Sequence, residues 1–159
     1  MEERPVHYSS PMPPALILGE GLNALAVARS LGRRGIVVMA IDPGHRSIST
    51  KSRYLKVIPC PQVGNPDEEL LNVVHRVADQ VGSPLVLIPT GDREVRFLSQ
   101  YRDSFPNTCK LVLASREAVQ ICLDKWAFVR WAEREGFPVP KTYQPNSMAE
   151  VKALSQDIR

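Results

Sequence analysis

The fold of this chain is decided by residues 15–42, which read ALILGEGLNALAVARSLGRRGIVVMAID. The stretch opens with a short apolar run that ends in glycine, a pattern typical of a buried strand. Leu25, Ala28 and Leu31 then recur at helical spacing, and Gly35 is placed to end that helix. The closing run, IVVMAID, is rich in β-branched side chains and predicts a second strand. A strand, a helix and a strand in this order predict two parallel strands joined by a crossover helix.

The alternation of strands and helices continues along the rest of the chain. Further apolar runs at residues 55–61, 84–92 and 110–115 predict three more strands. From this order we expect an α/β fold: a doubly wound, mainly parallel five-stranded Rossmann-like sheet in the order 3-2-1-4-5, with helices on both faces. The residues expected to cap the helices are Asn65, Asp92, Ser115, Asp124 and Ser147.

The composition is that of a soluble globular protein. The chain has 159 residues, of which 43% are hydrophobic and 23% are charged, which suits one domain of ordinary size. The formal net charge of +3 is too small to indicate a nucleic-acid partner. Cys60, Cys109 and Cys122 have no metal-like spacing, so we expect buried thiols in a reducing compartment. Without a membrane-length apolar run or a signal-peptide core, a cytoplasmic location is expected.

The sequence also predicts where a ligand would bind. In an open parallel sheet, ligands bind beyond the carboxyl ends of the strands, where the strand order reverses. Three segments are expected there: residues 19–24, 42–46 and 89–93. The first matches G-x-G-x-x-A, and Asp42 is placed to bind a ribose hydroxyl, so a NAD(P)-type dinucleotide-binding module is one interpretation. Glu20 opposes it, because a carboxylate in the glycine turn lies close to where a pyrophosphate would bind.

A lysine follows the capping residue of the helix that precedes the sequence GFPVP. Asp124 accepts amide hydrogens at that helix start, and Lys125 takes the first helical position. The N-terminal end of a helix already carries partial positive charge, so a lysine there is unfavourable unless an anion binds. A phosphate would relieve this conflict. From position alone, Lys125 is either a phosphate contact or a solvated surface lysine.

Four stretches, spread over about residues 15–145, match a known family by their order and spacing. They read LILGEGLNALAVARSLGRRGIVVMAID, SRYLKVIPCP, LVLIPTGDREVRFLS and LDKWAFVRWAEREGFPVPKTY. Together they resemble the N-terminal, pre-ATP-grasp domain of the ATP-grasp superfamily. The resemblance is closest to its predicted carboxylate–amine ligases, and more distant to carbamoyl phosphate synthetase large subunits, biotin carboxylase and D-alanine ligase. Its most diagnostic part is the ending, where DK is followed by a helix and by G-x-P-V-P-K-T.

The resemblance implies an ATP-dependent ligase that activates a carboxylate as an acyl phosphate, which an amine or similar nucleophile then attacks. It implies ATP and Mg²⁺ as cofactors of the intact enzyme, and small-molecule carboxylates and amines as its substrates. In this family the lysine of the DK pair contacts nucleotide phosphates, so Lys125 is the implied ATP contact. Asp92 and Arg93 either bind an amino-acid-like substrate or cap and solvate a helix. The implied acceptor side consists of Gly19, Glu20, Gly21, Asn23, Thr90, Asp92 and Arg93.

The same resemblance sets the expected domain organisation. Residues 1–14 are expected to form a flexible proline-rich arm, residues 15–137 the pre-ATP-grasp Rossmann-like domain, and residues 138–159 the start of a truncated ATP-grasp lobe. The catalytic lobes and the Mg²⁺ ligands would then be absent from this chain, so no catalytic or metal-binding residue is assigned. The chain is expected to be an inactive fragment of a ligase. The alternatives are the dinucleotide-binding module and a non-catalytic partner domain.

A basic loop lies outside this assignment. His45, Arg46, Lys51, Arg53 and Lys56 either contact phosphate or an acidic substrate, or form a solvated surface. Because aromatic and basic residues do not alternate, single-stranded nucleic acid is not an expected partner. We expect neither a nucleic-acid nor a membrane partner, and the outer helices of the sheet could form a homodimer.

Overall fold

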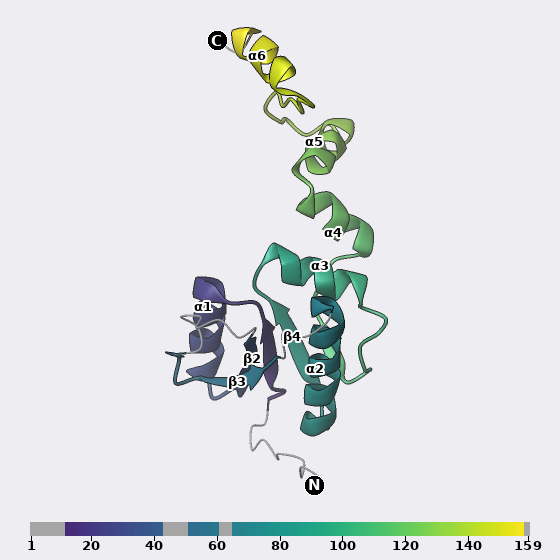
Figure 1. Ribbon diagram of the computed structural model, residues 1–159. Coiled ribbons are helices and arrows are strands. Elements are labelled where there is room, and N and C mark those ends of the chain that lie inside the picture. The colour runs from purple at the N-terminus through teal and green to yellow at the C-terminus, as the bar shows by residue number, and fades with distance from the viewer. Residues whose placement is uncertain (1–11, 43–50, 61–64, 158–159) are drawn as a thin grey trace. The chain divides into compact units, whose positions relative to one another are not determined.

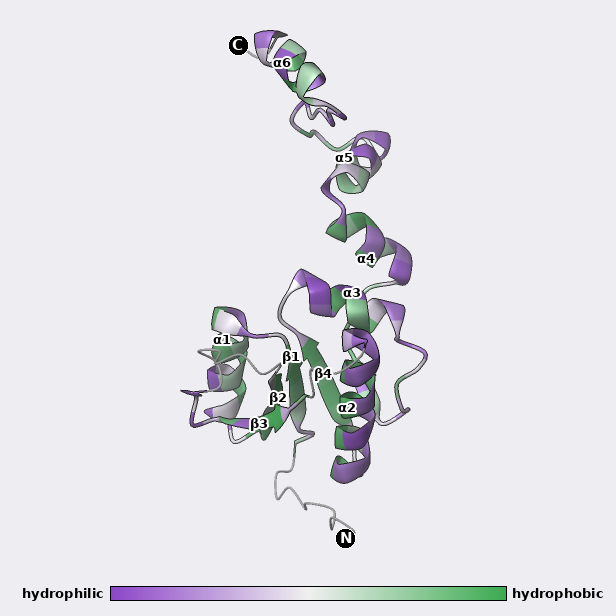
Figure 2. Ribbon diagram, viewed as in Figure 1, coloured by the Kyte–Doolittle hydropathy of each residue, from purple (hydrophilic) through white to green (hydrophobic). Residues whose placement is uncertain are grey.

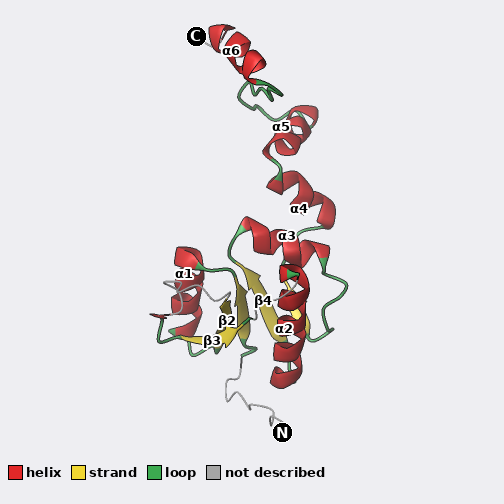
Figure 3. Ribbon diagram, in the orientation of Figure 1, coloured by secondary structure: helices red, strands yellow, loops and turns green. Residues whose placement is uncertain are grey.

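The computed structural model describes residues 12–42, 51–60 and 65–157 (Figure 1). The chain divides into two compact units, Met1–Val119 and Gln120–Arg159. The first unit contains a five-stranded sheet with helices against it, and the second is helical (Figure 3). Most of the expected N-terminal arm, and His45 and Arg46 of the basic loop, lie outside the described residues.

The sheet is parallel throughout. Its members are β1 (Ala15–Leu18), β2 (Val38–Asp42), β3 (Leu55–Pro59), β4 (Leu85–Pro89) and β5 (Cys109–Leu111). Their order is β3-β2-β1-β4-β5, which confirms the topology predicted from the sequence. The central strand β1 pairs with β2 on one side and with β4 on the other, so that Leu16 aligns with both Met39 and Leu87. The carboxyl ends of β1 and β4 therefore lie side by side, at the point where the strand order reverses.

The apolar runs determine how far each strand extends. All four residues of β1 are buried, because a central parallel strand is covered on both faces. The prediction of a strand over residues 110–115 is only partly right, since β5 begins at Cys109 and ends at Leu111. Pairing with β4 reaches only as far as Leu87 opposite Leu111. Val112, the next residue, has 89% of its surface exposed and gains nothing from continuing the strand.

Helices cover both faces of the sheet, as predicted. Ala24, on one face, belongs to a buried cluster with Ile17, and Val74, on the other face, belongs to a cluster with Leu16. Neighbouring residues of a strand point to opposite faces, which is why Leu16 and Ile17 belong to different clusters. Figure 2 shows the hydrophobic strands between helices whose outer sides are hydrophilic. These helices are α1 (Gly21–Gly32) on the Ile17 side, and α2 (Pro66–Val81) and α3 (Asp92–Gln100) on the Leu16 side.

The helix starts follow the sequence signals with one exception. The Asn65 side chain accepts a hydrogen bond from the Asp67 amide at 3.1 Å, so the predicted cap of α2 is confirmed. The predicted cap of α3 is wrong by one residue, because Gly91 takes the capping position and Asp92 is the first helical residue. Gly91 has an extended backbone there and no side chain to cap the helix.

The second unit is built from short helices with capped ends. Asp124 accepts hydrogen bonds from the amides of Trp126 at 2.9 Å and Ala127 at 3.0 Å, which confirms the predicted cap. The Ser147 hydroxyl likewise accepts from the backbone amide of Glu150, and in the first unit the Ser115 hydroxyl accepts from that of Ala118. The elements of this part of the chain are α4 (Arg116–Leu123), which crosses the boundary between the units, α5 (Lys125–Arg134) and α6 (Met148–Asp157).

An aromatic stack closes the end of α5. The Trp131 ring lies 5.8 Å from Phe137 and 6.0 Å from Phe128, measured between ring centroids. Gly136, with φ +78°, turns the chain so that Phe137 can donate its amide to Ala132 at 2.9 Å. The expectation that a new lobe begins at residue 138 stays a prediction. Among the described residues, the structure contains no helix long and apolar enough to cross a membrane.

Candidate functional site

Three hydrogen bonds tie the carboxyl ends of β1 and β4 together. The backbone amide and the hydroxyl of Thr90 both donate to the Leu18 carbonyl, each at 3.0 Å. The Asn23 side-chain amide donates to the Thr90 carbonyl at 3.1 Å. The turn from β1 into α1 and the turn from β4 into α3 are thus held as one edge of the sheet. We call this surface the carboxyl edge and define it by Gly19, Gly21, Asn23, Thr90, Gly91 and Glu94.

Two glycines of the carboxyl edge are required for different reasons. Gly19 has φ +102°, a conformation that other residues rarely adopt, and a Cβ there would overlap the Thr90 hydroxyl oxygen. Gly21 has φ +82°, but a Cβ there would meet no atom within 4 Å. Gly19 therefore allows both the turn and the close approach of β4, whereas Gly21 allows only the turn.

Glu94 lies against both turns, and the sequence analysis did not identify it. A Cβ on Gly91 would lie 2.7 Å from Glu94 Oε2, and one on Gly19 would lie 3.1 Å from the same oxygen. Glu94 occupies the third helical position after the capping residue Gly91, where a glutamate side chain folds back toward the helix start. That Gly-x-x-Glu spacing was the signal in the sequence that could have found it.

The carboxyl edge offers both signs of charge to a ligand. Neither α1 nor α3 has a side-chain cap at its start, so the first amide groups of both helices favour an anion. The Glu94 carboxylate, only half-buried, favours a cation beside them. A molecule with a carboxylate and an ammonium group matches this pairing. A dinucleotide pyrophosphate does not, since Glu94 and the exposed Glu20 place negative charge at the same turn.

The remaining acceptor-side predictions lie at the rim of the carboxyl edge. Glu20 precedes α1 and its side chain makes no capping hydrogen bond. Asp92 and Arg93 are the first two residues of α3, and both are exposed. Asp42 ends β2, where its backbone is paired in register with Pro59 of β3. The structure thus brings Gly19, Asn23 and Thr90 together. The charged side chains of Glu20, Asp92 and Arg93 belong to residues at the rim of the carboxyl edge.

Lys125 belongs to the second unit. It is the first residue of α5 and is exposed. Asp124 already binds two of the amides at this helix start. Both ion pairs among the described residues, Arg116–Asp103 and Arg134–Glu135, involve other side chains, so the Lys125 ammonium has no ionic partner within that part of the chain.

No protein-family model matches the sequence, and a search of curated proteins also found no match. Solved structures do match it. The L-amino acid ligase from Bacillus licheniformis superposes with a TM-score of 0.64 at 11% identity, over 91% of this chain and 34% of that one. N5-carboxyaminoimidazole ribonucleotide synthetase from Thermotoga maritima gives 0.57 at 18% identity, over 89% and 36%. The biotin carboxylase domain of Hydrogenobacter thermophilus 2-oxoglutarate carboxylase gives 0.56 at 18% identity, over 94% and 34%.

These similarities identify the fold. All three are ATP-grasp enzymes, and this chain spans about a third of the length of each. At such low identity the likeness is one of architecture. The chain shares its fold with the N-terminal part of these enzymes, which is consistent with the resemblance found in the sequence.

Proposed function

We propose that this chain is the substrate-side domain of an ATP-dependent carboxylate–amine ligase of the ATP-grasp type. The observation that carries the proposal is the Glu94 carboxylate, which lies against both glycine turns of the carboxyl edge. The fold that this chain shares with an L-amino acid ligase and with biotin carboxylase supports the same reading. The dinucleotide-binding module is the weaker alternative, because the carboxylates of Glu20 and Glu94 oppose a pyrophosphate.

The residues of this chain would bind and orient an amino-acid-like substrate. Glu94 Oε2 would accept a hydrogen bond from the substrate's amino group. The uncapped start of α1 would bind its carboxylate. The acceptor-side residues remain those that the resemblance implies, with Glu94 added: Gly19, Glu20, Gly21, Asn23, Thr90, Asp92 and Arg93.

Lys125 is the proposed contact to ATP. When bound, ATP supplies the phosphoryl group that activates the carboxylate. An exposed lysine without an ionic partner among the described residues could bind phosphate oxygens by a charge-assisted hydrogen bond. The MgADP complex of the 2-oxoglutarate carboxylase domain supports ATP and Mg²⁺ as cofactors. The described residues contain no group of three His, Cys, Asp or Glu side chains that could hold a metal, so we assign no Mg²⁺ ligand to this chain.

Two further expectations accompany the proposal. A homodimer is compatible with it, since the 2-oxoglutarate carboxylase domain was solved as a dimer. The small-molecule substrates, the absence of a nucleic-acid partner and the cytoplasmic location stay predictions.

Calorimetric titration of the chain with a panel of L-amino acids tests the acceptor site. Each amino acid is paired with the carboxylic acid that lacks its amino group. The Glu94→Gln variant should weaken binding of the amino acid by about tenfold or more, because a charged hydrogen bond contributes about 1.5–3 kcal/mol. Binding of the deaminated acid should change little. Glu117→Gln, which removes an exposed carboxylate from α4, is the matched control.

Two outcomes would contradict the acceptor assignment. One is an equal loss of both ligands in Glu94→Gln, which would show that Glu94 does not act on the amino group. The other is tight binding of NAD that Glu94→Gln strengthens, which would favour the dinucleotide-binding module. For the nucleotide, Lys125→Ala should weaken ATP binding while Lys152→Ala, an exposed lysine of α6, should not.

A further inference from the structure

A group of arginines gathers at the amino edge of the sheet, the end opposite to the carboxyl edge. Arg29, Arg33 and Arg34 lie at the end of α1, and Arg53 lies just before β3. These segments meet because Gly32 has no side chain: a Cβ there would lie 2.5 Å from Tyr54 Cβ. Any other residue at position 32 would push Tyr54, and Arg53 beside it, away from the helix end.

Tyr54 lies between Arg53 and the arginines at the end of α1. The Arg53 guanidinium donates a hydrogen bond to the Tyr54 hydroxyl at 2.9 Å, and its carbon lies 4.9 Å from the ring centroid. The hydrogen bond from Arg53 lowers the pKa of Tyr54 from its ordinary value, and the charge of Arg33 acts in the same direction. The phenol oxygen thus accepts from Arg53, and the missing side chain of Gly32 brings Tyr54 against the end of α1. Its own O–H remains a donor.

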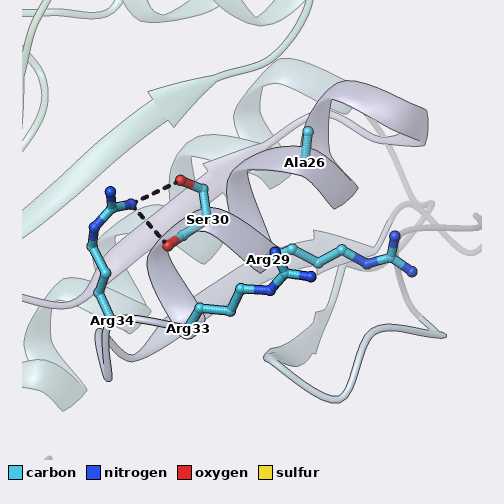
Figure 4. Close-up of a pocket in the computed structure, with 5 residues that line it drawn as sticks. All are labelled: Ala26, Arg29, Ser30, Arg33 and Arg34. Atoms are coloured by element: carbon cyan, nitrogen blue, oxygen red, sulfur yellow. Dashed lines mark hydrogen bonds between the residues drawn. The ribbon is translucent and has the colours of Figure 1, made fainter.

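The arginines of α1 line a hollow on the surface (Figure 4). Arg34 donates to the carbonyl of Ser30 at 3.2 Å and to its hydroxyl at 3.1 Å. One nitrogen of the Arg34 guanidinium is therefore already hydrogen-bonded within the protein. Arg29 and Arg33 extend in a different direction from Arg34 in Figure 4. A second hollow is lined by residues that include Arg53 and Tyr54.

The positive charge here has no described counter-charge. No acidic side chain lines either hollow. The ion pairs among the described residues are formed by Arg116 and Arg134 instead. Four guanidinium groups near one helix end repel one another; the partial negative charge at the C-terminal end of α1 offsets part of that repulsion, and a bound anion would offset more of it.

We propose that Arg33 and Arg53, with the Tyr54 hydroxyl, bind the phosphate group of a small phosphorylated ligand. The planar guanidinium fork matches the oxygens of a phosphate, and the donors of these three side chains are all compatible with a fully ionised acceptor. The group is confined to one helix end and the adjoining strand, so it suits one or two phosphates. A nucleic-acid backbone needs a longer basic stripe. Because this site lies at the amino edge, the inference does not rest on the proposed ligase function.

Titration of the full chain with sodium pyrophosphate, inorganic phosphate and AMP tests the site. Pyrophosphate and phosphate represent free anions, and AMP represents a phosphate ester. Arg33→Gln and Arg53→Gln should each weaken binding of the best ligand by about tenfold, as expected for one charged hydrogen bond. Tyr54→Phe should weaken it less, because it removes only the hydroxyl. Arg76→Gln, on α2 at the other face of the sheet, removes the same charge and should change affinity by less than about twofold.

Circular dichroism spectra that match the unmodified chain show that the variants fold. Equal weakening by Arg76→Gln would overturn the proposal, since it would mean that net charge alone attracts the anion. Affinity that neither Arg33→Gln nor Arg53→Gln changes would overturn it as well. A short DNA duplex that binds more tightly than pyrophosphate, and loses that binding in the same variants, would overturn the assignment to a small ligand.

Discussion

Replacing Gly19 with alanine should destabilise the sheet unit more than the same change at Gly21. Both glycines have positive φ, +102° and +82°, so both substitutions cause backbone strain. Only at Gly19 would the new Cβ meet other atoms, the Thr90 hydroxyl oxygen and Glu94 Oε2. The two variants therefore separate two losses of stability: the loss from backbone strain at a positive φ, and the loss from the clash with the side chains that approach Gly19.

The expected magnitudes follow from these contacts. Strain at a positive φ costs about 1–3 kcal/mol, of which about 0.4–1 kcal/mol is recovered because alanine restricts the unfolded chain. Gly21→Ala should therefore cost about 1–2 kcal/mol. At Gly19 the clash adds about 1–3 kcal/mol, and displacing the Thr90 hydroxyl from the Leu18 carbonyl adds about 0.5–1.5 kcal/mol. Gly19→Ala should therefore cost about 2.5–6.5 kcal/mol, a large share of a typical domain's stability of about 5–15 kcal/mol.

The assay must report on the sheet unit alone. Both tryptophans, Trp126 and Trp131, lie in α5 of the second unit, so their fluorescence reports the wrong part of the chain. Native-state hydrogen exchange at the amides of Leu16 and Ile17 in the buried strand β1 gives the free energy of opening directly.

A double-mutant cycle makes the result decisive. Thr90→Ala removes the hydroxyl that the Gly19→Ala side chain would overlap, so the double variant should be less destabilised than the sum of the single variants by about 1–3 kcal/mol. Gly21→Ala combined with Thr90→Ala should be additive within about 0.5 kcal/mol. Equal destabilisation by the two glycine substitutions, or additivity of Gly19→Ala with Thr90→Ala, would refute the reasoning.

Four further predictions concern single side chains. Arg53→Gln should raise the pKa of Tyr54 toward its ordinary value of 10.0, as followed by tyrosinate absorbance against pH; an unchanged midpoint would mean that Arg53 does not contact the phenol. Burial raises the pKa of the Cys109 thiol, so a thiol reagent at neutral pH should label the exposed Cys122 first, and early labelling of Cys109 would contradict its burial. The raised pKa of Cys109 also makes the free energy of unfolding depend on pH. Its contribution to stability is fully present below pH 9.0, the ordinary thiol pKa, and is lost as the pH rises through the pKa of the folded state. Cys109→Ala should therefore reduce the loss of stability seen in urea titrations at alkaline pH. Asp124→Ala should destabilise α5 by about 1 kcal/mol in tryptophan-monitored melting, whereas no change would mean that the cap is not formed in solution.

The fold could be predicted because its signals are local. The continuous apolar run at Ala15–Leu18 is typical of a strand covered on both faces, and the alternation with helices then indicates a parallel sheet. Asn65 and Asp124 marked the helix starts because their side chains cap amides two or three residues ahead. The length of β5 could not be predicted, since it depends on where pairing with β4 ends.

The candidate site was predicted only in part, because its contacts join distant segments. The glycine turn was visible in the sequence, but the hydrogen bonds from Asn23 to Thr90 and from Thr90 to Leu18 span 67 and 72 positions. Glu94 was missed because its role depends on a side chain that folds back over Gly91 and Gly19. The basic character around Arg53 was likewise visible, but not its approach to the end of α1, which depends on the missing side chain at Gly32.

The most direct test of the central claim is a site-resolved NMR titration of the chain with an L-amino acid that binds. If the carboxyl edge is the acceptor site, the amides of Gly19, Gly21 and Gly91 should shift, and Glu94→Gln should move the titration to about tenfold higher ligand concentration. The claim would be contradicted if no amino acid in the panel shifts these amides, or if NAD shifts them and the amino acids do not.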